Sequence, residues 1–242
     1  MDSVGRHVTQ ARRSLWRLLI ASSLAFAAIL APPTAHVNVV EGHCTNNPAQ
    51  YVQGYQDTTN QQNGVRAQIG WVQGNICTSG VYHFVVLCAM PGCTNAPVLW
   101  MQVGMMYFNW QAEPRSYCEF SGATYMFLDF NISHGPHDYK FQYDTFDDYW
   151  DCYVDSSFKA SQSRTAAGFD SGRYVGVQGE AIQAHVQIGE MAPSKLSYSA
   201  VKRRKESDGV WVFTNLSRVA PLFPYGSDLP FAYEMRAWTN AH

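Results

Sequence analysis

A succession of short runs, rich in β-branched and aromatic residues and separated by turn residues, constrains this chain most. From residue 64 onward no long segment repeats its apolar residues at the helical period of about 3.6. The expected strands cover residues 64–72, 82–87, 98–108, 116–119, 124–132, 138–145, 149–155, 180–188, 195–201 and 210–215. Turn residues such as Pro91-Gly92 and Asp208-Gly209 fall between them. This pattern predicts an all-β fold, an antiparallel two-sheet β-sandwich, in one domain.

Composition narrows the class of protein further. The 242 residues are 46% hydrophobic and 14% aromatic, and only 15% are charged. A typical domain has about 25% charged residues, so this chain is poor in charge and rich in aromatic residues. Disorder requires few aromatic residues and a high net charge, and a coiled coil requires a high content of Ala, Glu, Lys, Leu and Arg, so the composition excludes both. The formal net charge is −2, whereas a nucleic-acid-binding protein shows a clustered basic face, so we expect no nucleic-acid partner.

The N-terminus has the order of a secretory signal. Four arginines (Arg6, Arg12, Arg13 and Arg17) precede an apolar run over 18–31, and Pro33-Thr34-Ala35 follows it. A membrane span takes about 20 residues, which makes an uncleaved anchor the weaker alternative. We therefore expect residues 1–35 to be a signal peptide, and the mature chain to be secreted, mildly acidic and free of the membrane. Residues 36–63 read as an extended lead-in and 64–219 as the sandwich domain, whereas 220–242 have no clear pattern.

The cysteines agree with an oxidising compartment. All six lie after the proposed cleavage site, and their even number predicts disulfides. The sequence does not choose between the possible pairings; the pairs favoured here are Cys88–Cys93, Cys44–Cys77 and Cys118–Cys152. A zinc site would need paired ligands such as Cys-x-x-Cys, and these are missing, so we expect no metal.

Two strands present polar groups on otherwise apolar faces. In the strand 98–108 the even positions include Trp100, Gln102 and Met106, which place one amide on an aromatic and apolar face. Such a face belongs to a central strand or lines a groove. In the strand 180–188 Glu180 shares a face with apolar residues, and a desolvated carboxyl is a candidate acid or base. Alternatively, Glu180 lies at the strand end or beside a bulge after Gly179 and reaches water.

The order of several short motifs resembles a known family. Gly64-Val65-Arg66-Ala67-Gln68-Ile69 resembles the opening strand of the glutamic peptidases (eqolisins) and related bacterial concanavalin-like secreted proteins. Leu99-Trp100-Met101-Gln102-Val103-Gly104 resembles the family's leucine–glutamine–x–glycine strand. Tyr117-Cys118-Glu119 falls at its aromatic–x–Glu strand, and Gly179-Glu180-Ala181-Ile182 resembles its late strand. The resemblance spans roughly residues 64–215 and implies a concanavalin-like jelly roll.

The resemblance also implies a reaction. Carried over, the catalytic dyad would be Gln102 and Glu180, with Trp100, Met106, Tyr117 and Glu119 contacting the substrate. The Glu180 carboxylate would act as general base on the attacking water, and the Gln102 amide would stabilise the oxyanion. We then expect endopeptidase activity at acidic pH, with no cofactor, in a monomer that binds a polypeptide.

Other functions stay open. Residues 84–89 lack the Asp that the family carries before its Gln strand, which is compatible with a non-catalytic sandwich. Five aromatic residues could stack on sugar rings and make a carbohydrate-binding or surface-interaction module: Trp100, Phe108, Trp110, Tyr117 and Tyr125. A retaining glycosidase needs two carboxyls about 5 Å apart, for which Glu119 and Glu180 are the plausible pair.

Three further clusters predict only solvated surface. The aspartates of residues 144–155 lack the spacing of a calcium-binding loop, and His134 and His137 lie in an expected turn without a helical zinc motif. The basic run 202–205 is short and reads as a hairpin tip.

Overall fold

A computed structural model describes residues 50–70, 80–89, 99–108, 110–111, 113–122, 125–133, 135–181, 196–219 and 225–239. The predicted signal peptide, Cys44, Cys77 and Cys93 lie outside these ranges. Strands dominate the described part, and their bounds are β1 (Gln50–Gly70), β2 (Gly80–Cys88), β3 (Trp100–Phe108), β4 (Arg115–Phe120), β5 (Met126–Asn131), β6 (His137–Asp144), β7 (Tyr149–Val154), β8 (Ser157–Ser163), β9 (Gly172–Ala181), β10 (Leu196–Lys205), β11 (Trp211–Phe213), β12 (Ser217–Val219), β13 (Tyr225–Phe231) and β14 (Glu234–Thr239). The one described helix is the single turn α2 (Arg164–Ala167).

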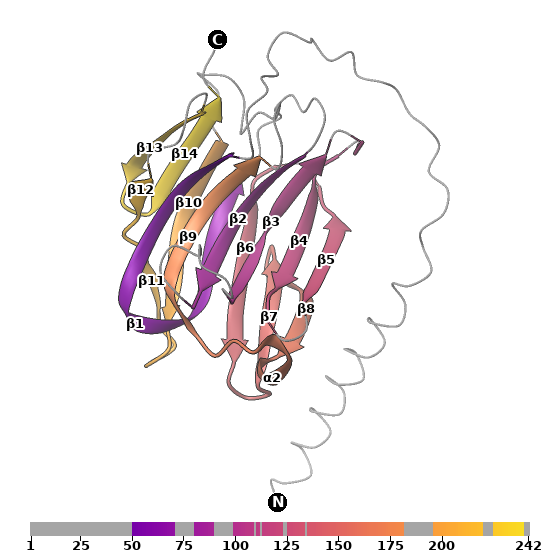
Figure 1. Cartoon of the computed structure of the whole chain (residues 1–242), viewed down its shortest axis with the longest axis vertical. Coiled ribbons are helices and arrows are strands. Elements are labelled where there is room, and N and C mark those ends of the chain that lie inside the picture. Colours follow the sequence, from indigo (N-terminus) through magenta and orange to yellow (C-terminus); the bar gives the residue numbers. More distant parts are fainter. Residues whose placement is uncertain are drawn as a thin grey trace, which may run out of the picture. The chain divides into compact units, whose positions relative to one another are not determined.

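The strands form an antiparallel sandwich, as the sequence predicts (Figure 1). The long strand β1 takes part in both layers. Its first half pairs with β9 and β12, and its second half pairs with β6 and β10, with a register shift between Asp57 and Gln62. The first layer continues β9–β2–β3–β4–β5, and the second contains β14–β10 on one side of β1 and β6–β7–β8 on the other. The sheet is not closed into a barrel.

The core lies between the layers and is held by side chains from both. From the first layer come alternate residues such as Val85, Met101 and Val103, and from the second come Phe141 and Trp150, all fully buried. Trp150 satisfies its buried indole N–H by donating to the carbonyl oxygen of Phe169, at 2.6 Å. The alternation of strand side chains thus leaves the opposite face of β9, β2, β3 and β4 available for a site.

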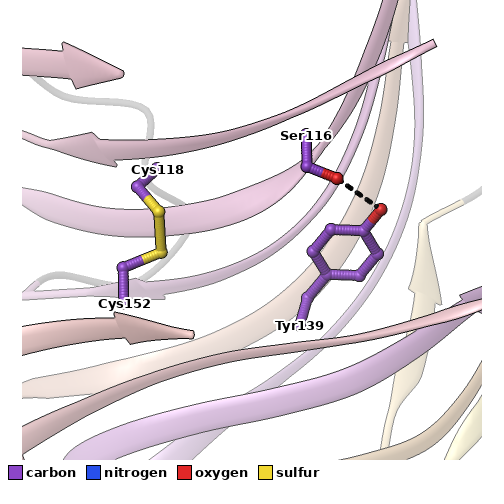
Figure 2. Close-up of a disulfide and its surroundings, with 4 residues drawn as sticks. All are labelled: Ser116, Cys118, Tyr139 and Cys152. Carbon is purple, nitrogen blue, oxygen red and sulfur yellow. Dashed lines mark hydrogen bonds between the residues drawn. A yellow bond between two sulfur atoms is a disulfide. The ribbon is translucent and has the colours of Figure 1, made fainter. Parts of the chain in front are cut away.

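A disulfide links the two layers. The pair Cys118–Cys152 joins β4 to β7 with its Cα atoms 6.2 Å apart. Beside it, the hydroxyls of Ser116 and Tyr139 are hydrogen-bonded at 3.0 Å, again from β4 to the second layer (Figure 2). Cys88 is also disulfide-bonded, to a partner outside the described residues. The Cys118–Cys152 disulfide and the Ser116–Tyr139 hydrogen bond fix β4, which carries Tyr117 and Glu119, against the second layer.

The structure differs from the predicted strands at four places. β1 begins at Gln50, so part of the expected lead-in belongs to the sheet. Its polar run forms a strand because buried amides find partners: Gln53 donates to Gln178 at 3.1 Å, and Gln62 accepts from Arg203 at 3.1 Å. β8 and α2 were not predicted. In the tail, β13 and β14 form a hairpin that extends the second layer beside β10.

The fourth difference concerns Glu180. The expected strand began at this residue, whereas β9 runs from Gly172 to Ala181 and places Glu180 near its end. Residues 182–188 lie outside the described part. β9 was not predicted because its glycines interrupt the alternation of side chains. Pairing with β1 on one side and with β2 on the other stabilises this strand. No helix in the described ranges is long and apolar enough to cross a membrane.

Candidate active site

The outer face of the first layer is aromatic. A second buried cluster lies there, on the side of β2, β3 and β4 that points away from the core. We call it the aromatic face; its residues are Phe84, Val86, Cys88, Met106, Tyr117 and Tyr174, with Tyr55, Tyr82, Trp100, Phe108 and Phe127 packed against them. The sequence predicted that even positions of residues 98–108 form an apolar face around Gln102, and the structure places Trp100, Gln102 and Met106 there.

Gln102 and Glu119 are direct cross-strand partners on this face. They lie opposite each other in the β3–β4 register, and the Gln102 side-chain N–H donates to Glu119 Oε2. Glu119 Oε1 accepts a second hydrogen bond from the Tyr125 hydroxyl, at 3.0 Å. Both oxygens of this carboxyl therefore have a donor.

Burial and hydrogen bonds act in opposite directions on Glu119. The residue is only 9% exposed, and this desolvation raises the pKa of its carboxyl. The donors Tyr125 and Gln102 favour the charged form and lower the same pKa, without cancelling the effect of burial. The indole N–H of Trp100 adds a smaller lowering effect, although it does not reach hydrogen-bond geometry.

Glu180 lies on the same face, further along the sheet. Its cross-strand partner on β2 is Tyr82, whereas the partner of Gln102 on β2 is Val86. Gln102 and Glu180 are thus two strands apart and offset by four residues, instead of directly opposed. Burial raises the pKa of the Glu180 carboxyl, and the negative charge of Glu119 raises it further. Glu119 therefore interacts with both members of the dyad that the sequence predicted.

Aromatic rings fill the space between these polar groups. Tyr82 packs edge-on against Tyr117, with ring centroids 5.2 Å apart, and both hydroxyls have raised pKa values because of burial and of the nearby glutamates. Tyr117 is wholly buried, and its hydroxyl has no hydrogen-bond partner within the described part of the chain. Tyr117 and the buried Met106 form the floor of the face, while Trp100 is half-buried.

Gly104 has a steric role in this floor. It is the glycine of the motif that follows Gln102, and it pairs with Phe84 on β2 and Tyr117 on β4. A Cβ atom at this position would overlap the carbonyl oxygen of His83. Only glycine permits this approach of β3 to β2.

Two exposed aromatic side chains lie at the margins. Trp110 is 70% exposed and stacks on Phe108 with centroids 5.5 Å apart, at the end of β3. Tyr125 is 58% exposed and precedes β5. The sequence pattern did not indicate Gln178 as a residue of this face. Tyr82 was not predicted either, although the even positions of residues 82–87 are all apolar or aromatic and indicate it.

The other polar clusters serve the fold. His137 hydrogen-bonds the Asp155 carboxylate at 2.5 Å and the Ser133 carbonyl at 2.7 Å. Nowhere in the described ranges do three or more His, Cys, Asp or Glu side chains gather as metal ligands would. The basic run 202–205 forms the last residues of β10, directly before the turn of the β10–β11 hairpin. There Arg203 donates to Gln56 and Arg204 donates to Asn63, at 3.3 and 3.0 Å.

Comparison with known proteins identifies the fold. No family model and no curated protein sequence matches the chain. Among solved structures, Scytalido-glutamic peptidase with a transition-state analogue inhibitor superposes with a TM-score of 0.57 at 10% identity, covering 79% of this chain and 98% of the other. SCP-B, a member of the eqolisin family in complex with the tripeptide Ala-Ile-His, superposes with a TM-score of 0.55, at the same identity and coverage. The chain therefore has the sandwich fold of the glutamic peptidases, and the resemblance of its motifs to that family agrees with this fold.

Proposed function

We propose that this chain is a secreted endopeptidase of the glutamic type, which hydrolyses peptide bonds at acidic pH with Gln102 and Glu180. The observation that carries the proposal is that one amide and two carboxyls share the aromatic face. Gln102 is bonded to Glu119, and the charge of Glu119 acts on Glu180. Carboxyls with raised pKa values in a semi-apolar setting are suited to acid–base work.

The reaction follows from these groups. Ionised Glu180 takes a proton from a water molecule, whose oxygen forms a bond to the scissile carbonyl carbon, and the carbonyl electron pair moves to the oxygen. An N–H of Gln102 stabilises this oxyanion. When the oxyanion collapses, the C–N bond breaks and the protonated Glu180 returns its proton to the leaving amine. The products are a carboxylic acid and an amine, and Glu180 is again ionised.

Secretion and a polypeptide substrate are parts of the same proposal. The Cys118–Cys152 disulfide is compatible with an extracellular location. The aromatic face offers apolar surface to the side chains of an extended substrate. We further propose that the mature chain works as a monomer without a cofactor.

The test is proteolysis by the purified mature protein over pH 2–7. Denatured protein substrate is incubated with the wild type, with Glu180→Gln and with Gln102→Ala, and new termini are counted by mass spectrometry. The matched control is Glu206→Gln, at an exposed glutamate in the turn after β10. We expect cleavage by the wild type and the control, and a loss of about 100-fold or more in kcat for the other two. Unchanged cleavage by Glu180→Gln, or none by the wild type, refutes the peptidase.

A second candidate is carbohydrate binding, favoured by one observation. Trp110, with its ring exposed and backed by Phe108, has the form of a platform for the apolar face of a sugar. A glycan array with the wild type and Trp110→Ala tests it. Binding that is lost in Trp110→Ala and kept in Glu180→Gln supports a carbohydrate module, whereas an array without any bound glycan removes it.

A further inference from the structure

The Glu119 carboxyl is engaged by other residues of the aromatic face. Its two oxygens accept from Gln102 and Tyr125, and the residue is 9% exposed. With a donor on each oxygen and most of its surface buried, this carboxyl presents little of itself to a substrate. The contacts of Glu119 are instead with other groups of the site.

The first of these contacts decides which way the Gln102 amide points. An amide has a donor end and an acceptor end, and by itself it can turn over. An ionised carboxylate only accepts hydrogen bonds, so the NH₂ end of Gln102 must face Glu119. One N–H is used there, and the second N–H remains for another acceptor. Without Glu119, either end of the amide could face a bound substrate.

The second contact is electrostatic. The charge of Glu119 is the largest cause, after burial, of the raised pKa of Glu180. Tyr82, on β2 between β4 and β9, packs against Tyr117 of β4, and these rings limit screening by water between the two carboxyls. The charge of Glu119 also raises the pKa values of Tyr82, Tyr117 and Tyr125.

The other charged and polar groups near Glu119 and Glu180 have partners of their own. Asp129 on β5 forms an ion pair with Arg115 on β4 at 2.6 Å, so the cation nearest along β4 is already matched. From β9 the side-chain amide of Gln178 favours the charged form of Glu180, and Gln178 itself accepts from Gln53 of β1.

We propose that Glu119 is a positioning residue, which fixes the direction of the Gln102 amide and couples its own charge to the protonation of Glu180. This inference rests on the proposed function for its role in catalysis, whereas the coupling itself is a property of the folded protein. Glu119 transfers no proton in the reaction. It makes Glu180 become ionised, and thus active as a base, only at a higher pH than burial alone would require.

Two variants separate the charge from the contact. Glu119→Gln keeps an oxygen that can accept from Gln102 but removes the charge. Glu119→Asp keeps the charge but is one methylene shorter, so its bond to Gln102 is lost. Glu206→Gln is the control for a change of charge elsewhere. Near-UV circular dichroism establishes that each variant is folded, and Glu119→Asp decides the question of amide orientation if Glu119→Gln does not fold.

The first readout needs no activity. Glutamate carboxyl carbons are followed by NMR from pH 3 to 8, and the Glu180 signal is assigned by its loss in Glu180→Gln. We expect the Glu180 titration to move to lower pH in Glu119→Gln, and to stay near the wild-type position in Glu119→Asp and Glu206→Gln. A Glu180 titration that is the same in Glu119→Gln and wild type overturns the coupling.

The second readout is kinetic. In Glu119→Gln the acid limb of the kcat profile should move to lower pH together with the NMR titration. In Glu119→Asp the limb should stay, while kcat falls about 10- to 100-fold because the amide is no longer held. An unchanged kcat in Glu119→Asp overturns the positioning role. If the wild type cleaves nothing while the NMR titration still moves in Glu119→Gln, the proposed function has failed and the coupling stands.

Discussion

The Gln102 amide and the Glu119 carboxylate are partners in the β3–β4 register and in a side-chain hydrogen bond. This pair adds a side-chain hydrogen bond to the backbone pairing of the two strands. The charge of Glu119 in turn raises the pKa of the Glu180 carboxyl. The polar groups of the aromatic face therefore act as one unit, and a change at any of them should be measurable at the others.

Tyr125→Phe should change the ionisation of Glu119 without harm to the fold. The Tyr125 hydroxyl donates to Glu119 at 3.0 Å and thereby lowers the pKa of this carboxyl. Removal of the donor should move the Glu119 titration to higher pH, as followed by carboxyl-carbon NMR. Because Tyr125 is largely exposed, the free energy of unfolding should change by less than about 1 kcal/mol. Tyr233→Phe, at an exposed turn tyrosine, is the control and should leave the titration in place.

Gly104→Ala should destabilise the sheet. The added methyl group would overlap the His83 carbonyl oxygen, so β3 would have to move away from β2. We expect a loss of about 3 kcal/mol in the free energy of unfolding, measured by urea denaturation. Gly54→Ala is the matched control, since the nearest atom to its new methyl would be the flexible Met235 sulfur at 3.1 Å. Equal losses in both variants would contradict the steric role of Gly104.

Replacing the Cys118–Cys152 disulfide by two alanines should weaken both stability and the site. The bond closes a loop with a sequence separation of 34, and its removal should cost about 3–4 kcal/mol in the free energy of unfolding. Because Cys118 lies between Tyr117 and Glu119 on β4, greater mobility of this strand should also lower kcat. Denaturation under non-reducing conditions measures the first effect. A loss below about 1 kcal/mol would show that the layers are held without it.

Stability should fall in acid because of His83. This histidine is 1% exposed, its Nδ1 lies 2.7 Å from the Tyr198 hydroxyl, and burial lowers its pKa to about 3. The unfolded chain, with an ordinary value of about 6.5, binds the proton first, so stability is full above this pH and is lost as the pH falls toward about 3. Between pH 7 and 4 the loss from this residue is up to about 3 kcal/mol.

His83→Gln tests this contribution. The Gln side chain can still bond to the Tyr198 hydroxyl and takes up no proton, so the variant should lose less stability between pH 7 and 4 than the wild type. Urea denaturation at the two pH values gives the comparison. Parallel losses in both proteins would mean that other groups cause the acid sensitivity.

Much of the fold could be predicted from local patterns. Alternation over residues 98–108 correctly placed Gln102 and Met106 on one face and Met101 and Val103 on the other, because side chains of a strand alternate with a period of two whatever the neighbours are. The pattern failed for residues 50–63, where buried amides find partners on other strands, such as Gln178 for Gln53 and Arg203 for Gln62. It also failed for β9, where glycines remove the alternation and two neighbouring strands supply the stability.

The site shows the same division. The sequence alone determined that an amide and a carboxyl would lie on apolar strands, since that depends on the order of residues along each strand. It did not determine that Glu119 would face Gln102, that Glu180 would lie opposite Tyr82, or that Tyr117 would be buried as floor. Those relationships depend on strand register and on which strands become neighbours. Register is set by long-range pairing and packing, so only the tertiary structure decided that Glu119 connects the two groups of the predicted dyad.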